Sequence, residues 1–239
     1  MYYMAMQAVG DSGIARVKGF FKRRPRLYDW MVYLFGAQPH NTTGYAFVRR
    51  FPADAHIVNV GSGPRRLRDG VINIDVAAFE GVDVVADIEH LPFPDASVDA
   101  VVCDNVLEHV PHPARAVEEM RRVLKLGGHI YVAAPFVMVY HSSPDDFNRW
   151  SKQGLRELMR DFDEVELRVQ HGPTTTFVFV LCEWLATLLS FNTTFLYTVV
   201  LLVTTAATAP LKFLDYLFAH YDTAENLANS FYFIGKKKV

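Results

Sequence analysis

The sequence has little cysteine, no excess of positive charge and no internal repeat. Its two cysteines, Cys103 and Cys182, lie far apart and match no zinc or disulfide spacing, which predicts no metal site and a reducing compartment. The formal net charge of -2 argues against a general nucleic-acid-binding protein. Asp11 and a group of basic residues precede the first apolar run, so we expect no secretory signal and a cytoplasmic location.

Residues 1–50 are predicted to form a separate helical segment that is both basic and aromatic. Apolar and aromatic side chains occur throughout Ile14 to Phe35, and six basic residues lie between positions 16 and 26, a span that contains no acid: Arg16, Lys18, Lys22, Arg23, Arg24 and Arg26. This pattern is typical of a helix that lies on an anionic membrane surface. A helix that covers a ligand site and packs its aromatic rings on the core explains the pattern equally well.

The stretch from His56 to Asp75 predicts two short strands around a glycine turn. An apolar run over residues 57–60 enters Gly61-Ser62-Gly63, and a second run over residues 71–74 ends on Asp75. Glycines let the backbone bend sharply and let a ligand approach closely. An acid at the end of a strand is a suitable acceptor for the two hydroxyls of a ribose. The stretch therefore predicts a nucleotide-type cofactor site, with an ordinary tight turn as the alternative.

Short apolar runs alternate with loops or helices as far as Pro135, which predicts an α/β fold with a parallel sheet. Further strands are expected over residues 82–86, 100–103 and 129–134. A helix is expected from Pro113 to Lys125, because proline suits a helix start and Gly127-Gly128 suits a helix end.

Five motifs then occur in a characteristic order. They are Val-Asn-Val-Gly-Ser-Gly (58–63), Asn-Ile-Asp (73–75), Ala-Asp-Ile-Glu-His-Leu-Pro-Phe (86–93), Asp-Asn-Val-Leu-Glu-His-Val (104–110) and Arg-Val-Leu-Lys-Leu-Gly-Gly (122–128). Over roughly residues 55–170, this set resembles the class I S-adenosylmethionine-dependent methyltransferases, and more narrowly their small-molecule branch, type 11. The resemblance implies a Rossmann-like sheet whose last strand is antiparallel, and S-adenosylmethionine as cofactor.

The resemblance also implies a cofactor site made of the following residues: Gly61, Ser62, Gly63, Asp75, Val76, Asp87, Ile88 and Asn105. The glycine turn would lie against the methionine part of the cofactor. Asp75 would hold the ribose hydroxyls, and Asp87 with Ile88 would bind the adenine. Asn105 would face the methionine carboxylate or the substrate. Arg65 departs from the family pattern, because it stands where a third glycine is common.

Residues 135–150 follow the predicted fifth strand, at the place where ligands bind in such sheets. They predict a substrate wall, with His141 or an aspartate as general base and His109 as a second candidate base. The expected substrate contacts are Tyr140, Asp145, Arg149 and Trp150. The structural alternatives are a local pair between Asp146 and Arg149, an anchoring role for Trp150 and a structural role for His109.

Residues 177–218 contain only three charged side chains, and Trp184–Leu211 contains none. This predicts a hydrophobic helical insertion over residues 177–222, before a last strand within residues 223–239. The segment is long enough to span a bilayer, but a last strand that returns to the sheet excludes a single crossing. We expect two runs, split at Asn192-Thr193-Thr194, that form a hairpin or interfacial helices in one leaflet. A helical lid or a homodimer interface is the alternative.

The predicted function is methyl transfer from S-adenosylmethionine to a small or amphipathic acceptor: a lipid, a quinone-like ring or a lipid-linked sugar. Oxygen is the favoured acceptor atom, and the core domain is expected over residues 51–176. A membrane-associated enzyme would lie on the inner face. A nucleotide-dependent oxidoreductase is less favoured, because Arg66 stands where the dinucleotide fingerprint needs glycine and because Asp75 follows Gly63 by only 12 residues. A non-catalytic binding protein with the same fold is the other alternative.

Overall fold

The computed structural model describes residues 41–141 and 145–238, which fall into two compact units. The sheet unit comprises residues 41–136, 147–170 and 230–238. The helical unit comprises residues 137–141, 145–146 and 171–229. The basic cluster between Arg16 and Arg26 lies outside the described residues, so the membrane-surface helix predicted there stays a prediction.

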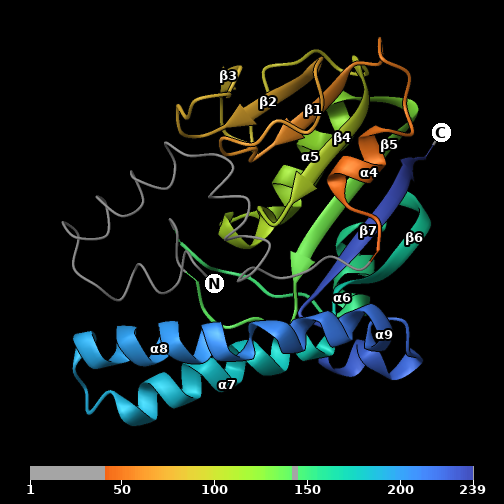
Figure 1. The fold of residues 1–239 in the computed structure, drawn as a ribbon. Helices are drawn as coiled ribbons and strands as arrows, with labels where there is room; N and C mark the ends of the chain where they lie inside the picture. Colours follow the sequence, from red (N-terminus) through yellow and green to blue (C-terminus); the bar gives the residue numbers. More distant parts are fainter. Residues whose placement is uncertain (1–40, 142–144, 239) are drawn as a thin grey trace. The chain divides into compact units, whose positions relative to one another are not determined.

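The sheet unit contains seven strands in the order β3-β2-β1-β4-β5-β7-β6 (Figure 1). β1 pairs in parallel with β2 and β4, β2 with β3, and β4 with β5, whereas β7 is antiparallel to β5. The predicted α/β class with an antiparallel last strand is confirmed. The strands are β1 (Ile57–Val60), β2 (Val71–Asp75), β3 (Val84–Val85), β4 (Val98–Asp104), β5 (Leu124–Pro135), β6 (Phe162–His171) and β7 (Ser230–Lys237).

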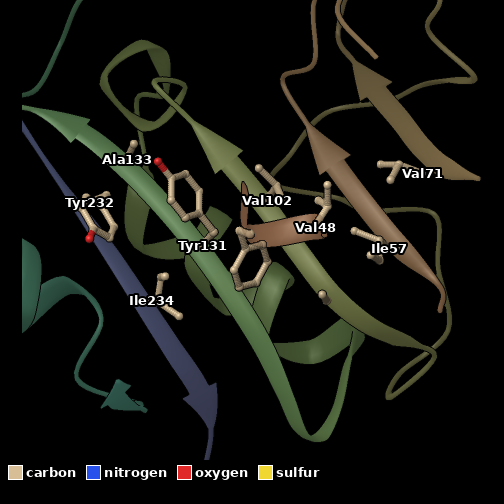
Figure 2. Packing of buried hydrophobic residues seen from close by; sticks show 10 residues of the cluster. Val48, Ile57, Val71, Val102, Tyr131, Ala133, Tyr232 and Ile234 are labelled. Carbon is tan, nitrogen blue, oxygen red and sulfur yellow. The ribbon is translucent and has the colours of Figure 1, made fainter. Parts of the chain in front are cut away.

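The hydrophobic core of this unit follows from the position of the strands. All four residues of β1 are buried, as expected for a central parallel strand that is covered on both faces. Helix α4 (Gly44–Val48) contributes Phe47 and Val48 to one face, where the stacked rings of Tyr131 and Tyr232 also lie (Figure 2). Alternate strand residues face the other way. Helix α5 (Pro113–Val123) adds buried apolar side chains to the core: Ala116, Val117, Met120 and Val123.

Local sequence signals explain where several elements begin. The Thr43 hydroxyl accepts a hydrogen bond from Ala46 N at the start of α4. Ser151 does the same for Gly154 N at the start of α6 (Lys152–Leu158), and Pro113 opens α5. A short 3₁₀ turn, η1 (Leu107–His109), follows β4.

The predicted end of α5 is wrong. The helix stops at Val123, and Leu124 already has extended backbone angles and pairs with Val98 of β4. Gly127, with φ +71°, lies within strand β5 and does not terminate the helix. Strand pairing with β4 therefore takes precedence over the helical pattern at residues 124 and 125.

The helical unit contains the predicted apolar segment, which forms two main helices separated at residues 190–193. α7 spans Pro173–Leu189 and α8 spans Thr194–Thr208; η2 (Ala209–Leu214), α9 (Asp215–Phe218) and η3 (Asp222–Leu227) follow. Judged by length and composition alone, the helical stretch Thr194–Phe218 suffices to cross a membrane, whereas α7 is shorter. The seam between α7 and α8 is made of Val178, Phe179, Cys182, Ala186 and Leu201.

Candidate functional site

Four neighbouring parallel strands of the sheet unit end at one edge of the sheet. β1 ends just before Gly61, β2 ends at Asp75, β3 ends two residues before Asp87, and β4 ends at Asp104. Because these strands run in the same direction, the four segments that follow them meet at their carboxyl ends. This is the edge at which open α/β sheets bind ligands.

The glycine turn after β1 has two residues with a left-handed backbone, Gly61 (φ +64°) and Gly63 (φ +52°). A Cβ added at Gly61 would lie 2.3 Å from the Val106 side chain, so this glycine permits close packing onto the segment after β4. At Gly63, no atom of the described residues lies within 4 Å of the corresponding position. Gly61 is thus required for packing, whereas Gly63 leaves open space beside the backbone.

Asp75 connects the end of β2 to this turn. Its Oδ2 accepts a hydrogen bond from Gly63 N at 2.9 Å, and its Oδ1 accepts one from Ala77 N at 3.0 Å. A carboxylate oxygen can accept two hydrogen bonds, so each oxygen retains a lone pair. The carboxylate therefore fixes the turn and can still accept hydrogen bonds from two hydroxyls of a ligand.

The segment after β3 lies beside the end of β2. Ala86 N donates to the main-chain oxygen of Asp75 at 3.0 Å, which brings Asp87 next to this strand end. Asp87 Oδ1 accepts a hydrogen bond from Glu89 N at 2.9 Å and closes a turn around the buried Ile88. Val76 is exposed. The predicted residues of this part therefore lie together, with one apolar side chain, that of Val76, accessible to a ligand.

The last residue of β4 is a carboxylate that was not predicted from the sequence as part of the site. Asp104 Oδ1 accepts hydrogen bonds from Asn105 Nδ2 at 2.8 Å and from Gln170 Nε2 at 3.2 Å, and Gln170 also donates to the Tyr131 hydroxyl. Burial raises the pKa of the Asp104 carboxyl, and the nearby Glu108 carboxyl raises it further, although hydrogen bonds from Gln170 and Asn105 oppose the shift. The position of Asp104 at a strand end, like that of Asp75, is the signal that points to it.

In the sheet unit, residues 147–150 run beside η1. Phe147 N donates to Glu108 O at 2.7 Å, Asn148 Nδ2 donates to Val110 O at 3.2 Å, and Trp150 N donates to Pro135 O at 2.9 Å. These contacts bring the segment that contains Arg149 and Trp150 next to the turn that contains His109. The second candidate base, His109, and two predicted substrate contacts, Arg149 and Trp150, therefore lie on neighbouring segments.

The first candidate base, His141, and the other two predicted substrate contacts, Tyr140 and Asp145, belong to the helical unit. Asp146 Oδ2 accepts a hydrogen bond from His141 N at 2.9 Å and lies 3.5 Å from His141 Nδ1. Val139 O lies 3.4 Å from the same ring nitrogen. Two acceptors at Nδ1 favour the tautomer with its proton there, which leaves Nε2 as the basic nitrogen. The contact between Asp146 and His141 was not predicted from the sequence.

Comparisons with known proteins show similarity to methyltransferases. A family model described as a methyltransferase domain matches residues 67–132. A ubiquinone/menaquinone biosynthesis C-methyltransferase, UbiE, from Bordetella avium is 43% identical over 138 residues, which are 54% of this chain and 51% of that protein. An uncharacterized chloroplastic methyltransferase of Arabidopsis thaliana is 42% identical over 77 residues, which are 32% of this chain and 21% of that protein. The matches thus span about half or less of these relatives' length.

A solved structure shares the fold across most of the chain. It is a protein from Thermotoga maritima described as a SAM-dependent methyltransferase, possible histamine N-methyltransferase. The TM-score is 0.52 at 17% identity, with 91% of this chain and 98% of that chain covered. At this level of identity the likeness establishes the fold.

Proposed function

We propose that this chain is a class I S-adenosylmethionine-dependent methyltransferase and that it transfers a methyl group from this cofactor to a small or amphipathic acceptor. The observation that carries the proposal is the edge formed by the glycine turn, Asp75 and Asn105. It combines an open backbone surface, a carboxylate with two available lone pairs and a carboxamide, all on segments that follow parallel strands.

The chemistry of these groups fits S-adenosylmethionine. Asp75 would accept hydrogen bonds from the two ribose hydroxyls, and the open side of Gly63 would lie against the methionine part. The exposed Val76 and the turn at Asp87 would border the adenine. Asn105 would face the methionine carboxylate or the acceptor. These assignments rest on the family resemblance together with the contacts of each residue.

S-adenosylmethionine supplies a methyl carbon on a positively charged sulfur, which is a good leaving group in a displacement. The protein then has to hold the acceptor in line and exclude water. An oxygen acceptor also has to lose a proton. His141 is our proposed base, because Asp146 and Val139 O both lie at Nδ1 and favour a basic Nε2. His109 is the second candidate.

A carbon acceptor on a quinone-like ring is a second candidate for the reaction. It is favoured by the 43% identity to a protein that is described as a ubiquinone/menaquinone biosynthesis C-methyltransferase. An amphipathic acceptor of either kind agrees with the large apolar surface of α7 and α8. We propose a cytoplasmic location, because both cysteines are free, as is usual in a reducing compartment. The enzyme would act at the inner face of a membrane.

The test is calorimetric titration of the full chain with S-adenosylmethionine and, separately, with NAD. We expect binding of S-adenosylmethionine only. Asp75→Asn and Gly63→Ala should each weaken binding at least about tenfold, because the first removes an acceptor for ribose and the second fills the open side of the turn. Asp99→Asn is the matched control, since Asp99 lies at the opposite end of the sheet, beside Lys125.

Binding of NAD alone would favour an oxidoreductase, and binding of neither would favour a protein that has the fold without the reaction. If S-adenosylmethionine binds, incubation of a membrane lipid extract with methyl-labelled cofactor identifies the acceptor. Mass spectrometry of the labelled product then distinguishes a methyl ether from a ring carbon. Absence of any labelled product, in soluble and lipid extracts alike, contradicts the proposed transfer.

A further inference from the structure

We call the paired helices α7 and α8 the apolar hairpin. They expose apolar side chains to solvent on nearly all of their outer surface. Val178, Phe179 and Leu201 lie in the buried seam between the two helices. The exposed side chains include Phe177, Val180, Trp184, Leu188, Leu189, Phe191, Phe195, Leu196, Val199, Leu202 and Val203. A helix that is apolar all round is normally buried in protein or in lipid, and a soluble monomer rarely exposes a patch of this extent.

The polar side chains of α8 and of the tip are largely satisfied within the hairpin itself, whereas the buried hydroxyls of Thr175 and Thr176, at the base of α7, have no hydrogen-bond partner among the described residues. Three threonine hydroxyls in α8 donate to carbonyl oxygens four residues earlier: Thr198 to Thr194 O, Thr204 to Val200 O and Thr208 to Thr204 O, at 2.7–2.8 Å. Ser190 and Thr193 bond to neighbouring carbonyls at the tip. Such internal pairing is needed where the surroundings offer no hydrogen bonds, as in the hydrocarbon of a bilayer.

The hairpin also carries almost no charge, and its single charged side chain is hydrogen-bonded within the hairpin. Glu183 is the single charged residue between Pro173 and Leu211, and its carboxylate accepts a hydrogen bond from the Tyr197 hydroxyl on the partner helix. A protein partner would be recognised through a polar rim with about one hydrogen bond per 100–200 Å². The hairpin offers almost no donors or acceptors for such a rim. A lipid environment therefore fits this surface better than a protein partner does.

Polar groups gather instead at the base of the hairpin. Asp215 is fully buried, and its carboxylate accepts hydrogen bonds from Thr174 N at 2.8 Å and from Thr175 N at 2.7 Å. This carboxylate lies at the positive end of the α7 dipole and ties the first turn of α7 to the start of α9. Both ends of the hairpin are thus fixed at its base, and the tip at Phe191 lies at the other end of the two helices.

Chain connectivity and helix length limit how such a hairpin meets a membrane. The chain enters α7 from β6 and later returns to β7 of the same sheet, so both ends must stay on one side of a bilayer. The 17 residues of α7 span about 25 Å, which is less than the ~30 Å of a hydrocarbon core. A hairpin of this length reaches into the bilayer and turns back.

We propose that the apolar hairpin inserts tip first into a lipid bilayer from one side, with its polar base at the headgroups. This concerns a surface outside the cofactor site and does not require the chain to be a methyltransferase. Phe191 and Phe195, which are 80% and 75% exposed, would enter the acyl chains first.

The test is flotation of the full chain with vesicles of phosphatidylcholine, alone or mixed with phosphatidylglycerol. The variant Phe191→Asn with Phe195→Glu replaces two exposed side chains with residues that suit their positions: asparagine tolerates the φ of +46° at residue 191, and glutamate suits the first turn of α8. We expect the wild type to float with the vesicles and the variant to bind at least about tenfold more weakly.

The matched control is Leu126→Glu with Val165→Glu, which removes two exposed apolar side chains from the sheet unit. We expect it to float like the wild type. Cofactor affinity and circular dichroism check that each variant is folded. As a second measurement, brominated lipids should quench the fluorescence of the exposed Trp184, and the vesicle-dependent quenching should disappear in Trp184→Phe.

Three results would overturn the proposal. One is a wild-type chain that stays at the bottom of the gradient. Another is equal flotation of the wild type and the tip variant without quenching of Trp184, which would place lipid binding elsewhere. The third is a lipid-free dimer that the tip variant dissociates and that does not float, which would assign the surface to a second copy of the chain.

Discussion

At the residue scale, two aspartates of β4 experience opposite environments. Asp104, at the carboxyl end, is half-buried, and loss of solvent around its carboxyl raises its pKa. Asp99, near the amino end, contacts Lys125 Nζ at 2.7 Å and accepts a hydrogen bond from His56 N, and these contacts lower its pKa. Both start from the ordinary value of 3.8, so their effects on stability should depend on pH in opposite directions.

We expect Asp104→Asn to raise the melting temperature by a few degrees at pH 7. A folded-state pKa above the ordinary value means that Asp104 destabilises the folded protein increasingly as pH rises from 3.8 through the raised pKa. Asparagine removes this penalty and retains an oxygen for Gln170 and Asn105. Thermal unfolding at a series of pH values should show that the advantage vanishes as pH falls towards 3.8.

The control is Asp99→Asn, for which the sign is reversed. A lowered pKa contributes stability that is present above the ordinary value and is lost as pH falls through the folded-state pKa. The variant should therefore melt below the wild type at pH 7 and approach it in acid. A pH-independent difference for Asp104→Asn, or a lower melting temperature at pH 7, would show that its carboxyl is not held in an unfavourable environment.

At the element scale, the connection between β1 and β2 is unusual because its ten residues, 61–70, contain no helix. Two arginines hold it instead. Arg68 donates to Val48 O, Phe51 O and Pro52 O at 2.9–3.0 Å, across the end of α4. Arg66 pairs with Asp83 at 2.7 Å on the surface. Guanidinium groups thus replace the packing that a crossover helix would otherwise provide.

We expect Arg68→Ala to lower the free energy of unfolding by about 2 kcal/mol, because three carbonyl groups lose a charged donor. Arg66→Ala should cost less, since its ion pair is solvent-exposed and screened. Urea unfolding of both variants, followed by circular dichroism, measures the difference. Equal losses for the two variants would mean that the hydrogen bonds of Arg68 to the α4 end contribute little.

How far the sequence predicts the structure depends on whether a feature is local. The glycine turn and the acid at Asp75 follow from neighbouring residues, and the structure has them where they were expected. The apolar segment also divides in two, at residues 190–193, which overlaps the predicted split at residues 192–194. The end of α5 was predicted incorrectly because Leu124 pairs with Val98, which is distant in sequence. The same reason hides the network around Asp104, whose partner Gln170 lies 66 residues later.

The predicted catalytic and substrate-binding roles of residues 135–150 also depend on long-range contacts, and these roles remain predictions. Sequence order suggested that residues 135–150 act together, yet they divide between the two units: Tyr140 and His141 in one, Arg149 and Trp150 in the other. No periodicity in the sequence reports such a division, because it depends on which long-range contacts each half of the loop makes. Phe147 illustrates this, since its main-chain N–H donates to Glu108 O of the sheet unit, which is distant in sequence.

At the scale of the whole molecule, the two cysteines provide one probe for each unit. Cys103 lies in β4 of the sheet unit and Cys182 in α7 of the helical unit; both are free and fully buried. Burial raises the pKa of the Cys103 thiol well above its usual value, so it reacts poorly while the protein is folded. Modification by a thiol reagent therefore requires opening of the unit that contains the cysteine.

We expect S-adenosylmethionine to slow modification of Cys103 and to leave that of Cys182 unchanged within about twofold. A ligand that binds only the folded form lowers the population of the open form by a factor of 1 + [L]/Kd, so ligand at about 100 Kd should slow Cys103 by up to ~100-fold. Cys103→Ala and Cys182→Ala assign the two rates. Equal slowing of both thiols would show that the units open together, and slowing of Cys182 alone would place the cofactor site in the helical unit.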